Sequence, residues 1–150
     1  MTGDILERNL IIYTDGGARG NPGPGAIGVY VTEEDGKVLA KISKRIGQST
    51  NNEAEYRAVI EALKWIIESA GGKVPALPRG EQSVKFFLDS KLVVNQLNGI
   101  FKIKENRLRN LLIEVRGLEQ EIGGKIIYNH VPRGKNKMAD YLVNASFSAL

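Results

Sequence analysis

LIIYTD at residues 10–15 and VKFFLD at residues 84–89 are two short apolar runs that each end on an aspartate. Runs of this length and composition are typical of buried β-strands, and a strand that ends on an acid delivers a negative charge to the rim of its sheet. Two further acids, Glu55 and Asp140, occur where helices are expected. Because clustered carboxylates repel one another and raise one another's pKa, a site that keeps them ionised normally holds a divalent metal. The sequence therefore predicts a metal-binding carboxylate site.

The bulk composition predicts one globular domain that spans residues 1–150. The chain is 42% hydrophobic and its formal net charge is +4, a mild basic excess that favours a polyanionic partner. Cysteine is absent, which excludes disulfides and thiolate metal sites. No stretch approaches the roughly 18–20 apolar residues of a membrane span, and the first residues lack a signal-peptide pattern. We therefore expect a soluble cytoplasmic protein that meets no membrane.

Hydrophobic patterning predicts an α/β fold with five strands and four helices. The strands are expected at about residues 9–15, 25–33, 38–46, 83–89 and 125–131. The helices are expected at about residues 50–70, 90–97, 105–122 and from 136 to the C-terminus. Short connections make the first three strands antiparallel, whereas helical crossovers place the last two parallel to the first. The result is a five-stranded mixed sheet, three antiparallel strands then two parallel, flanked by helices.

This topology brings the carboxyl ends of the first and fourth strands together, so Asp15 and Asp89 should emerge side by side at the edge where open α/β sheets bind ligands.

The positions of apolar residues in the helix at about residues 50–70 select a third acid. Positions three, four, seven, eight and eleven after Glu55 are all apolar, so Glu55 lies on the face that packs on the sheet. Glu53 occupies the N3 position of a capping box that begins at Thr50, and we expect its role to be structural.

Each of the other acids has an ordinary alternative. Asp15 and Asp89 can be turn formers or helix caps, and for Asp89, directly before a helix, capping is a serious rival. An acid in the first turn of any helix is stabilised by the helix dipole. The pattern alone therefore favours a structural role and a site role for Asp140 about equally. The glycine-rich segment 16–25 is either a hairpin turn or side-chain-free backbone that a sugar-phosphate chain can approach, and beside a metal site we favour the second interpretation.

In these motifs the chain resembles a type I ribonuclease H over essentially its full length. The matching segments, in order, are Tyr13–Gly17 with Asn21–Gly23, Thr50–Asn52 with Ala54–Glu55, Asp89–Ser90, and His130–Arg133 with Asn136 and Ala139–Asp140. The resemblance implies a ribonuclease H-like fold and metal-dependent hydrolysis of the RNA strand of an RNA/DNA hybrid, which leaves a 5′-phosphate and a 3′-hydroxyl. It implies two Mg²⁺ ions, with Mn²⁺ as the alternative, held by Asp15, Glu55, Asp89 and Asp140.

The resemblance also implies roles for residues that contact the substrate. Backbone groups of Gly16 and Gly17, with Asn21, Asn51 and Glu55, are placed for the 2′-hydroxyl that distinguishes RNA from DNA. Thr50 and Asn52 suit the DNA strand and its phosphate, and Ser90 adjoins the site. His130, the only histidine, occupies the position of the family's mobile loop histidine. Because members with a His-Val-Pro-Arg loop rely on the arginine instead, we divide this role between His130 and Arg133.

The chain departs from the family pattern in two respects. Well-known bacterial members insert a basic protrusion after the second helix, and the sequence here has only residues 100–104 in that place. A separate hybrid-binding domain is also missing from the pattern. Hybrid affinity should then rest on Lys102, Lys104, Arg107 and Arg109 and should depend strongly on salt. The loop at residues 71–82 is expected to be a surface elaboration remote from catalysis.

Two other functions remain open from the sequence. One is a non-catalytic RNA/DNA hybrid-binding module, which would be expected to have lost a carboxylate. The other is a nuclease of the same fold that acts on DNA, since one fold supports several substrates. Nothing in the sequence indicates a protein partner, and we expect a monomer.

Overall fold

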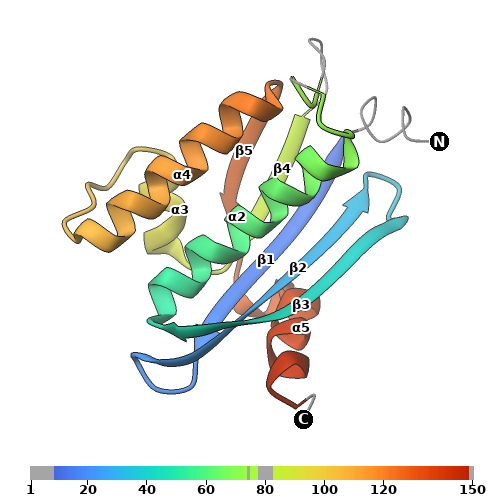
Figure 1. Ribbon diagram of the computed structural model, residues 1–150. Helices are drawn as coiled ribbons and strands as arrows, with labels where there is room; N and C mark the ends of the chain where they lie inside the picture. Colours follow the sequence, from blue (N-terminus) through green and yellow to red (C-terminus); the bar gives the residue numbers. More distant parts are fainter. Residues whose placement is uncertain (1–8, 74, 78–82, 149–150) are drawn as a thin grey trace.

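The computed structural model describes residues 9–73, 75–77 and 83–148. Five strands form one sheet in the order β3-β2-β1-β4-β5 (Figure 1). Their bounds are Leu10–Ala18 for β1, Gly23–Glu33 for β2, Val38–Ser49 for β3, Ser83–Leu88 for β4 and Lys125–His130 for β5. β1, β2 and β3 pair antiparallel, and β4 and β5 pair parallel to β1. The predicted mixed α/β sheet is confirmed.

Helices cover both faces of this sheet. Their bounds are Asn51–Ser69 for α2, Lys91–Leu97 for α3, Asn106–Ile122 for α4 and Lys137–Ser148 for α5, with a short 3₁₀ turn, η1, at Arg133–Lys135. α2 lies against β1 and β2 and beside α4, whereas α5 crosses the opposite face over β1, β2 and β3 (Figure 1). No helix among the described residues combines the length and apolarity needed to cross a membrane.

The core lies between the sheet and α2. Alternate residues of β1, such as Leu10 and Ile12, are fully buried, and so is the α2 stripe that includes Ala58, Leu63 and Ile66. Two glycines allow the helices to come this close to the sheet. A Cβ at Gly16 would lie 2.2 Å from the Ala54 backbone oxygen of α2, and the equivalent approach to α5 occurs at Gly28.

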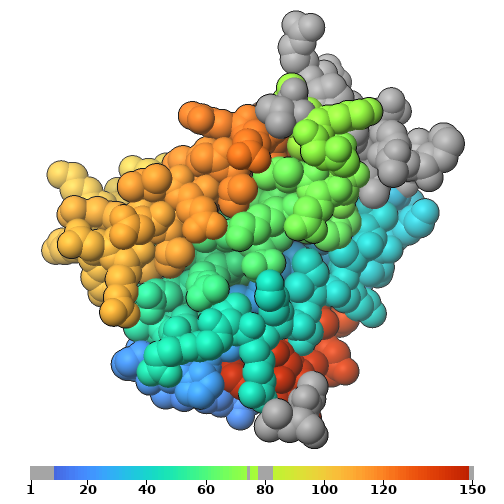
Figure 2. Space-filling model, in the orientation of Figure 1, coloured from blue at the N-terminus to red at the C-terminus, as the bar shows by residue number. Residues whose placement is uncertain are grey.

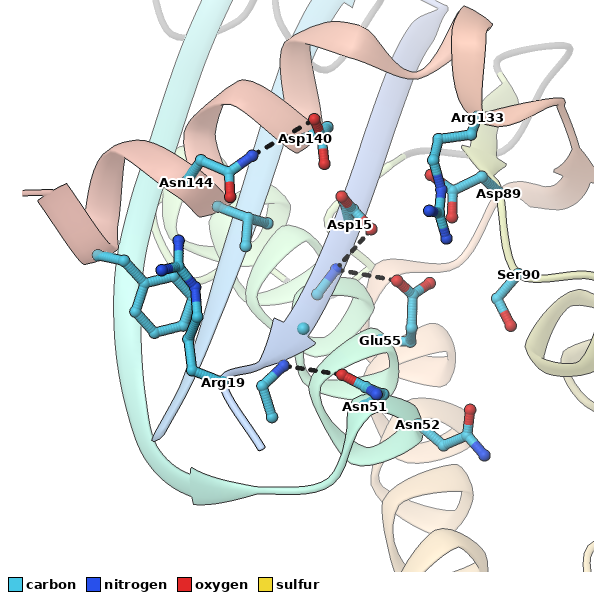
Figure 3. Close-up of a pocket in the computed structure, with 15 residues that line it drawn as sticks. Asp15, Arg19, Asn51, Asn52, Glu55, Asp89, Ser90, Arg133, Asp140 and Asn144 are labelled. Atoms are coloured by element: carbon cyan, nitrogen blue, oxygen red, sulfur yellow. Dashed lines mark hydrogen bonds between the residues drawn. The ribbon is translucent and has the colours of Figure 1, made fainter. Parts of the chain in front are cut away.

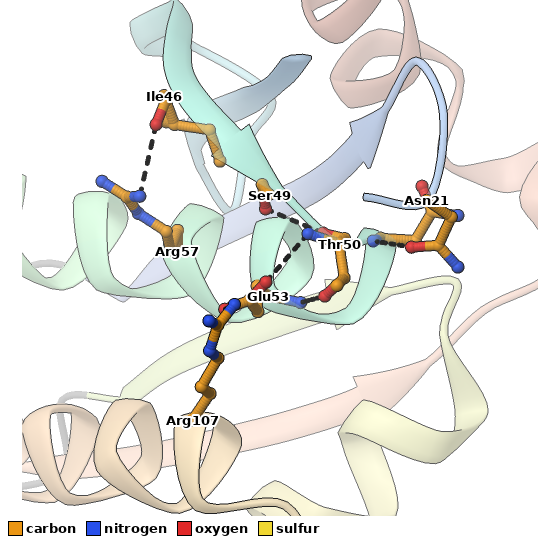
Figure 4. Close-up of polar contacts among 8 residues, drawn as sticks. Asn21, Ile46, Ser49, Thr50, Glu53, Arg57 and Arg107 are labelled. Carbon is orange, nitrogen blue, oxygen red and sulfur yellow. Dashed lines mark hydrogen bonds and ion pairs between the residues drawn. The ribbon is translucent and has the colours of Figure 1, made fainter. Parts of the chain in front are cut away.

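The capping box predicted at the start of α2 is confirmed. Thr50 is the N-cap, its hydroxyl accepts from the Glu53 amide, and the Glu53 carboxylate accepts from the Thr50 amide at 2.9 Å (Figure 4). The carboxylate of Glu53 also faces Arg107 of α4 at 3.9 Å. Glu53 is therefore a structural residue that fixes the start of α2.

Two expectations about the chain path need correction. β1 does not end at residue 15, because its pairing with β2 continues through Gly16, Gly17 and Ala18. The loop at residues 71–82 is not only a surface elaboration, since Ala76 and Leu77 are buried in the core and their amides donate to backbone oxygens at the end of α4. Residues 74 and 78–82 of that loop lie outside the described residues.

The edge of the molecule near the carboxyl ends of β1 and β4 is built from segments far apart in sequence. The connection between β1 and β2 meets the C-terminal helix α5 there, as the space-filling view shows (Figure 2). The four carboxylates predicted from the sequence gather beside this junction.

Candidate active site

Three carboxylates converge at the carboxyl ends of β1 and β4. One oxygen each from Asp15, Glu55 and Asp89 lies within 4.8 Å of the other two (Figure 3). The parallel pairing of β1 with β4 ends at the Tyr13–Phe87 pair, so each aspartate stands two residues beyond the last paired position. Glu55 comes from the buried face of α2. The predicted convergence of these three acids is therefore present in the structure.

Glu55 has a buried carboxylate oxygen that suits a cation. The side chain is only 6% exposed, and its Oε1 accepts a hydrogen bond of 3.0 Å from the Gly16 amide, which also donates to Asp15 Oδ1. Its second oxygen, Oε2, is buried and meets no hydrogen-bond donor within the described residues. A buried, unpaired carboxylate oxygen is costly, and a cation would remove that cost. Three oxygen donors of this kind fit a hard divalent cation.

The electrostatics of the cluster agree with this fit. Burial, followed by the negative charges of Asp89 and Asp140, raises the pKa of Asp15 to about 6, although hydrogen bonding from its neighbours partly offsets the rise. Burial and the adjacent Asp15 raise the pKa of Glu55 well above its usual value. Without a bound cation the site therefore resists full ionisation, and a divalent charge would reverse that resistance.

Asp89 is not a helix cap. The N-cap of α3 is Ser90, whose hydroxyl accepts from the Val93 amide at 3.3 Å. The Asp89 carboxylate instead accepts a hydrogen bond of 3.0 Å from the side-chain amide of Asn136, which precedes α5. The capping alternative is thus wrong, and Asp89 is held facing the cluster.

Asp140 lies in the first turn of α5 and lines the same cavity of about 420 Å³, but it stands outside the group of three acids. Its Oδ2 accepts from Asn144 at 3.4 Å (Figure 3). The α5 residues that line the cavity with it, Val143, Asn144 and Phe147, follow at spacings of three, four and seven. Helical spacing counted from Asp140 is the sequence signal that would have found them.

Comparison with known proteins identifies the family. Residues 13–146 match the family model described as reverse transcriptase-like. A solved ribonuclease H1 isolated from compost is 41% identical, with a TM-score of 0.84, over 95% of this chain and 97% of that one. The ribonuclease H1 of the archaeon Halobacterium salinarum is 33% identical, with a TM-score of 0.82, over 95% of this chain and 99% of that one. The chain belongs to the type I ribonuclease H family.

Several curated relatives that the chain matches are longer proteins. A bifunctional protein of Mycobacterium tuberculosis is 38% identical over 141 residues, which is 93% of this chain and 36% of the relative. Ribonuclease HI of Halobacterium salinarum is 37% identical over 132 residues, which is 88% of this chain and 61% of the relative. The chain thus spans between about a third and three fifths of the length of these relatives.

The residues that the ribonuclease H resemblance assigned to substrate fall into two groups. Gly16, Gly17, Asn51, Asn52 and Ser90 line the cavity. Four others, Asn21, Thr50, Lys102 and Lys104, are not among the lining residues. Asn21 Oδ1 accepts from the Asn51 amide at 2.9 Å, so it supports a residue that lines the cavity, and Thr50 caps α2 (Figure 4).

The basic residues on the connection between α3 and α4 and at the start of α4 do not line the cavity. Lys102 and Lys104 are exposed on this connection, residues 98–105, which is short and fully described. Arg109 donates to the Ile103 backbone oxygen at 2.9 Å and so braces the connection, while Arg107 faces Glu53. The surface they form has no extended protrusion.

The structure separates His130 from Arg133. Arg133 lines the cavity together with the carboxylates, whereas His130 is exposed at the end of β5 and is not among the lining residues (Figure 3). Arg19 also lines the cavity, and the sequence reasoning gave it no role. The sequence feature that could have identified Arg19 is a basic residue four positions after Asp15, within the glycine-rich segment.

The glycine-rich segment forms a hairpin connection, and part of it also lines the cavity. Its residues 19–22 form the connection between β1 and β2, and the Arg19 amide donates to the Pro24 oxygen at 2.8 Å. Gly16 is needed for the close approach of α2, but a Cβ at Gly17 would meet only Asn51 Oδ1, at 3.9 Å. Gly17 therefore leaves open backbone at the cavity wall, where a ligand can approach.

Proposed function

We propose that this chain is an endoribonuclease that hydrolyses the RNA strand of RNA/DNA hybrids with two divalent cations, Mg²⁺ or Mn²⁺, and leaves a 5′-phosphate and a 3′-hydroxyl. The observation that carries the proposal is the cluster of Asp15, Glu55 and Asp89, in which a buried Glu55 oxygen lacks a partner. A homologous ribonuclease H1, 41% identical with a TM-score of 0.85, has been crystallised in complex with an RNA/DNA hybrid, which supports this choice of substrate.

The carboxylates provide the cation-binding groups. Asp15, Glu55 and Asp89 form the centre of the proposed site, and Asp140 of α5 supplies a fourth carboxylate to the same cavity. Divalent cations held by these carboxylates would supply a nucleophilic water at neutral pH and neutralise charge that develops on the phosphate. The chain itself fixes the acids before substrate arrives: Gly16 donates to Asp15 and Glu55, and Asn136 donates to Asp89.

The cavity walls position the nucleic acid. The backbone beside Gly17 and the side chain of Asn51 are the groups we assign to the 2′-hydroxyl of the RNA strand. Asn51 is held for this task, because its Oδ1 accepts from the Ala18 amide at 2.9 Å and its own amide donates to Asn21. Asn52, next to Asn51 on α2, and Ser90 also line the cavity, and we place the DNA strand along them (Figure 3).

The exposed lysines extend the binding surface. Lys102 and Lys104 lie outside the cavity and carry charges free to meet backbone phosphates further along the duplex. Contacts of this kind are independent of sequence and weaken with salt, so we assign them to overall affinity and not to the choice of cleavage site. Arg133, within the cavity, is the basic group we assign to the reacting phosphate.

A cleavage assay with one labelled RNA strand tests the function. The strand is presented as an RNA/DNA hybrid, as duplex RNA and alone, each with Mg²⁺, with Mn²⁺ and with chelator. We expect cleavage of the hybrid with either metal and none in chelator, and cleavage in chelator would overturn the metal mechanism. Binding of the hybrid without cleavage would indicate a non-catalytic module, and cleavage of the DNA strand would indicate a DNA nuclease.

A further inference from the structure

Arg19 stands at the cavity with its guanidinium stacked on an aromatic ring. The residue is exposed, follows β1 and lines the same cavity as the carboxylates. Its guanidinium carbon lies 4.4 Å from the centroid of the Phe147 ring, near the end of α5. Figure 3 shows Arg19 and Asn144 on one side of the carboxylates, and Asn52 and Ser90 on the opposite side.

Phe147 is itself fixed by Arg45 of β3. Arg45 Nε donates to the Ser146 oxygen and its Nη2 donates to the Phe147 oxygen, both at 3.1 Å. These are carbonyls of the last turn of α5, which have no partner within the helix and which a cation suits. The Arg45 guanidinium also lies 5.7 Å from the Phe147 ring centroid. The ring that supports Arg19 is therefore anchored to the sheet.

The backbone of Arg19 is equally constrained. Its amide donates to the Pro24 oxygen at 2.8 Å, which closes the connection between β1 and β2. A Cβ at Gly23 would lie 2.1 Å from the Arg19 oxygen, so the two segments of this connection are in contact. The backbone of Arg19 is held by the hydrogen bond to Pro24, and its guanidinium is held by stacking on Phe147. The long side chain therefore has little conformational freedom to lose when a ligand binds.

The hydrogen-bonding edge of this guanidinium is unused. Within residues 9–73, 75–77 and 83–148, the Arg19 side chain forms no ion pair and no hydrogen bond, although four carboxylates lie nearby in the structure. Stacking occupies the face of a guanidinium and leaves its N–H groups directed outward in the plane. A planar fork of this kind matches the two free oxygens of a phosphodiester.

We propose that Arg19 is a substrate-binding residue that contacts a backbone phosphate of the strand lying across the carboxylates, on the α5 side of the scissile bond. Phe147 and Arg45 are its positioning residues, and through them the C-terminal helix sets the position of the substrate. This assignment rests on the proposed function for its ligand, a nucleic-acid phosphate. A pre-stacked arginine also binds at lower entropic cost than a mobile lysine.

Binding measurements in the non-cleaving Asp89→Asn background test this role. Hybrid affinity is measured by fluorescence anisotropy across a range of salt concentrations for the background protein and with Arg19→Ala added. We expect Arg19→Ala to raise Kd about tenfold, as for the loss of a charged hydrogen bond. The slope of log Kd against log salt should fall by about 0.7–0.9, the effect of one lost phosphate contact. Arg19→Lys should keep the slope and recover only part of the affinity.

The matched control is Lys125→Ala, which removes an exposed cation from the first residue of β5, at the opposite end of the sheet. It should change neither Kd nor the slope. A double-mutant cycle tests Phe147: Phe147→Leu should raise Kd in the presence of Arg19 and have no effect with Arg19→Ala, whereas Phe147→Tyr should preserve binding. Equal effects of Phe147→Leu in both backgrounds would overturn the positioning role.

Failure of this inference is distinguishable from failure of the proposed function. If cleavage is normal and Arg19→Ala leaves Kd and salt slope unchanged, the inference is overturned and the function stands. If the wild-type protein binds the hybrid without cutting it while Arg19→Ala still weakens binding, the nuclease function fails and the phosphate contact stands. If the wild-type protein neither binds nor cleaves the hybrid and the Asp89→Asn protein does not bind it, both are overturned.

Discussion

Asn136 donates a hydrogen bond of 3.0 Å to the carboxylate of Asp89, and the same amide nitrogen donates to the Thr14 backbone oxygen at 2.9 Å. Asn136 is 1% exposed and directly precedes α5. One buried side chain thus joins the residue before Asp15 on β1, the acid that follows β4, and the helix that carries Asp140. The relative placement of the carboxylates depends on a residue that is not itself a carboxylate.

Replacing Asn136 should therefore damage both stability and catalysis. Asn136→Ala removes two hydrogen bonds from a buried position, so we expect the free energy of unfolding to fall by about 1–3 kcal/mol. Because Asp89 loses its support, metal-dependent cleavage should fall roughly 10–100-fold, as for partners that orient metal ligands. Urea denaturation and a cleavage assay measure the two effects. The control is Asn110→Ala, on the exposed surface of α4, which should alter neither; full activity of Asn136→Ala would contradict the argument.

Asp89→Asn is the most direct test of the acid cluster. The amide keeps the size of the carboxylate, and its oxygen can still accept from Asn136, so the fold should be preserved. The charge needed to bind a cation is lost, and we expect cleavage to fall by more than about 100-fold, beyond the usual effect of losing a supporting partner. Hybrid binding should remain close to that of the wild type. Retention of full activity would show that Asp89 is not a metal ligand.

The raised pKa of Asp15 predicts how stability varies with pH in chelator. Because burial raises the pKa from 3.8 to about 6, the folded state takes up a proton more readily than the unfolded state. The resulting stabilisation is complete below about pH 4 and is lost as pH rises through 6. Relative to Asp15→Asn, the wild type should lose on the order of 2–3 kcal/mol of unfolding free energy between pH 4 and pH 7.

Urea denaturation at a series of pH values, for both proteins, measures this difference. Mg²⁺ added at pH 7 should restore stability to the wild type by binding the folded state, and should have little effect on Asp15→Asn. Curves that run parallel at all pH values would show that Asp15 is not destabilised by its surroundings in the metal-free protein.

The sequence predicted those parts of the site that follow from local periodicity. Glu55 was separable from Glu53 because the apolar stripe of α2 has a helical period, and the structure buries Glu55 as that period requires. The end of β1 was not predictable in this way. Gly16 and Gly17 give no hydrophobic signal, and they belong to the strand only because β2 pairs with them.

Contacts between distant segments set the remaining features. Helical spacing places Phe147 on the same face of α5 as Asp140, but only the crossing of α5 over the sheet brings that face to the cavity and Phe147 to Arg19. Similarly, the motif that contains Asn136 could be identified from the sequence. The hydrogen bond from Asn136 to Asp89, however, depends on the position of η1, which directly precedes Asn136, relative to the sheet. Sequence alone carries no measure of such distances.

Adjacent glycines allow a matched test of how α2 is seated. Gly16→Ala would place a Cβ 2.2 Å from the Ala54 oxygen, a backbone atom, so α2 must move away from β1 and take Glu55 with it. We expect a loss of about 1–3 kcal/mol or more, as for overpacking of a tight core. Gly17→Ala meets only Asn51 Oδ1 at 3.9 Å and should leave the free energy of unfolding within about 0.5 kcal/mol of wild type. Equal thermal stability of the two variants would refute this account.

Arg133 and His130 are distinguished by their positions, and kinetics can separate them. Arg133 lines the cavity beside the carboxylates, whereas His130 is exposed at the end of β5, outside that lining. Because a cation near the reacting phosphate stabilises charge in the transition state, we expect Arg133→Ala to lower kcat by about 10²-fold or more. His130→Ala should lower kcat less than Arg133→Ala does. Arg133→Lys separates charge from shape, since it keeps the cation and loses the planar fork, and it should recover part of kcat. A larger loss of kcat in His130→Ala than in Arg133→Ala would assign the role to the histidine.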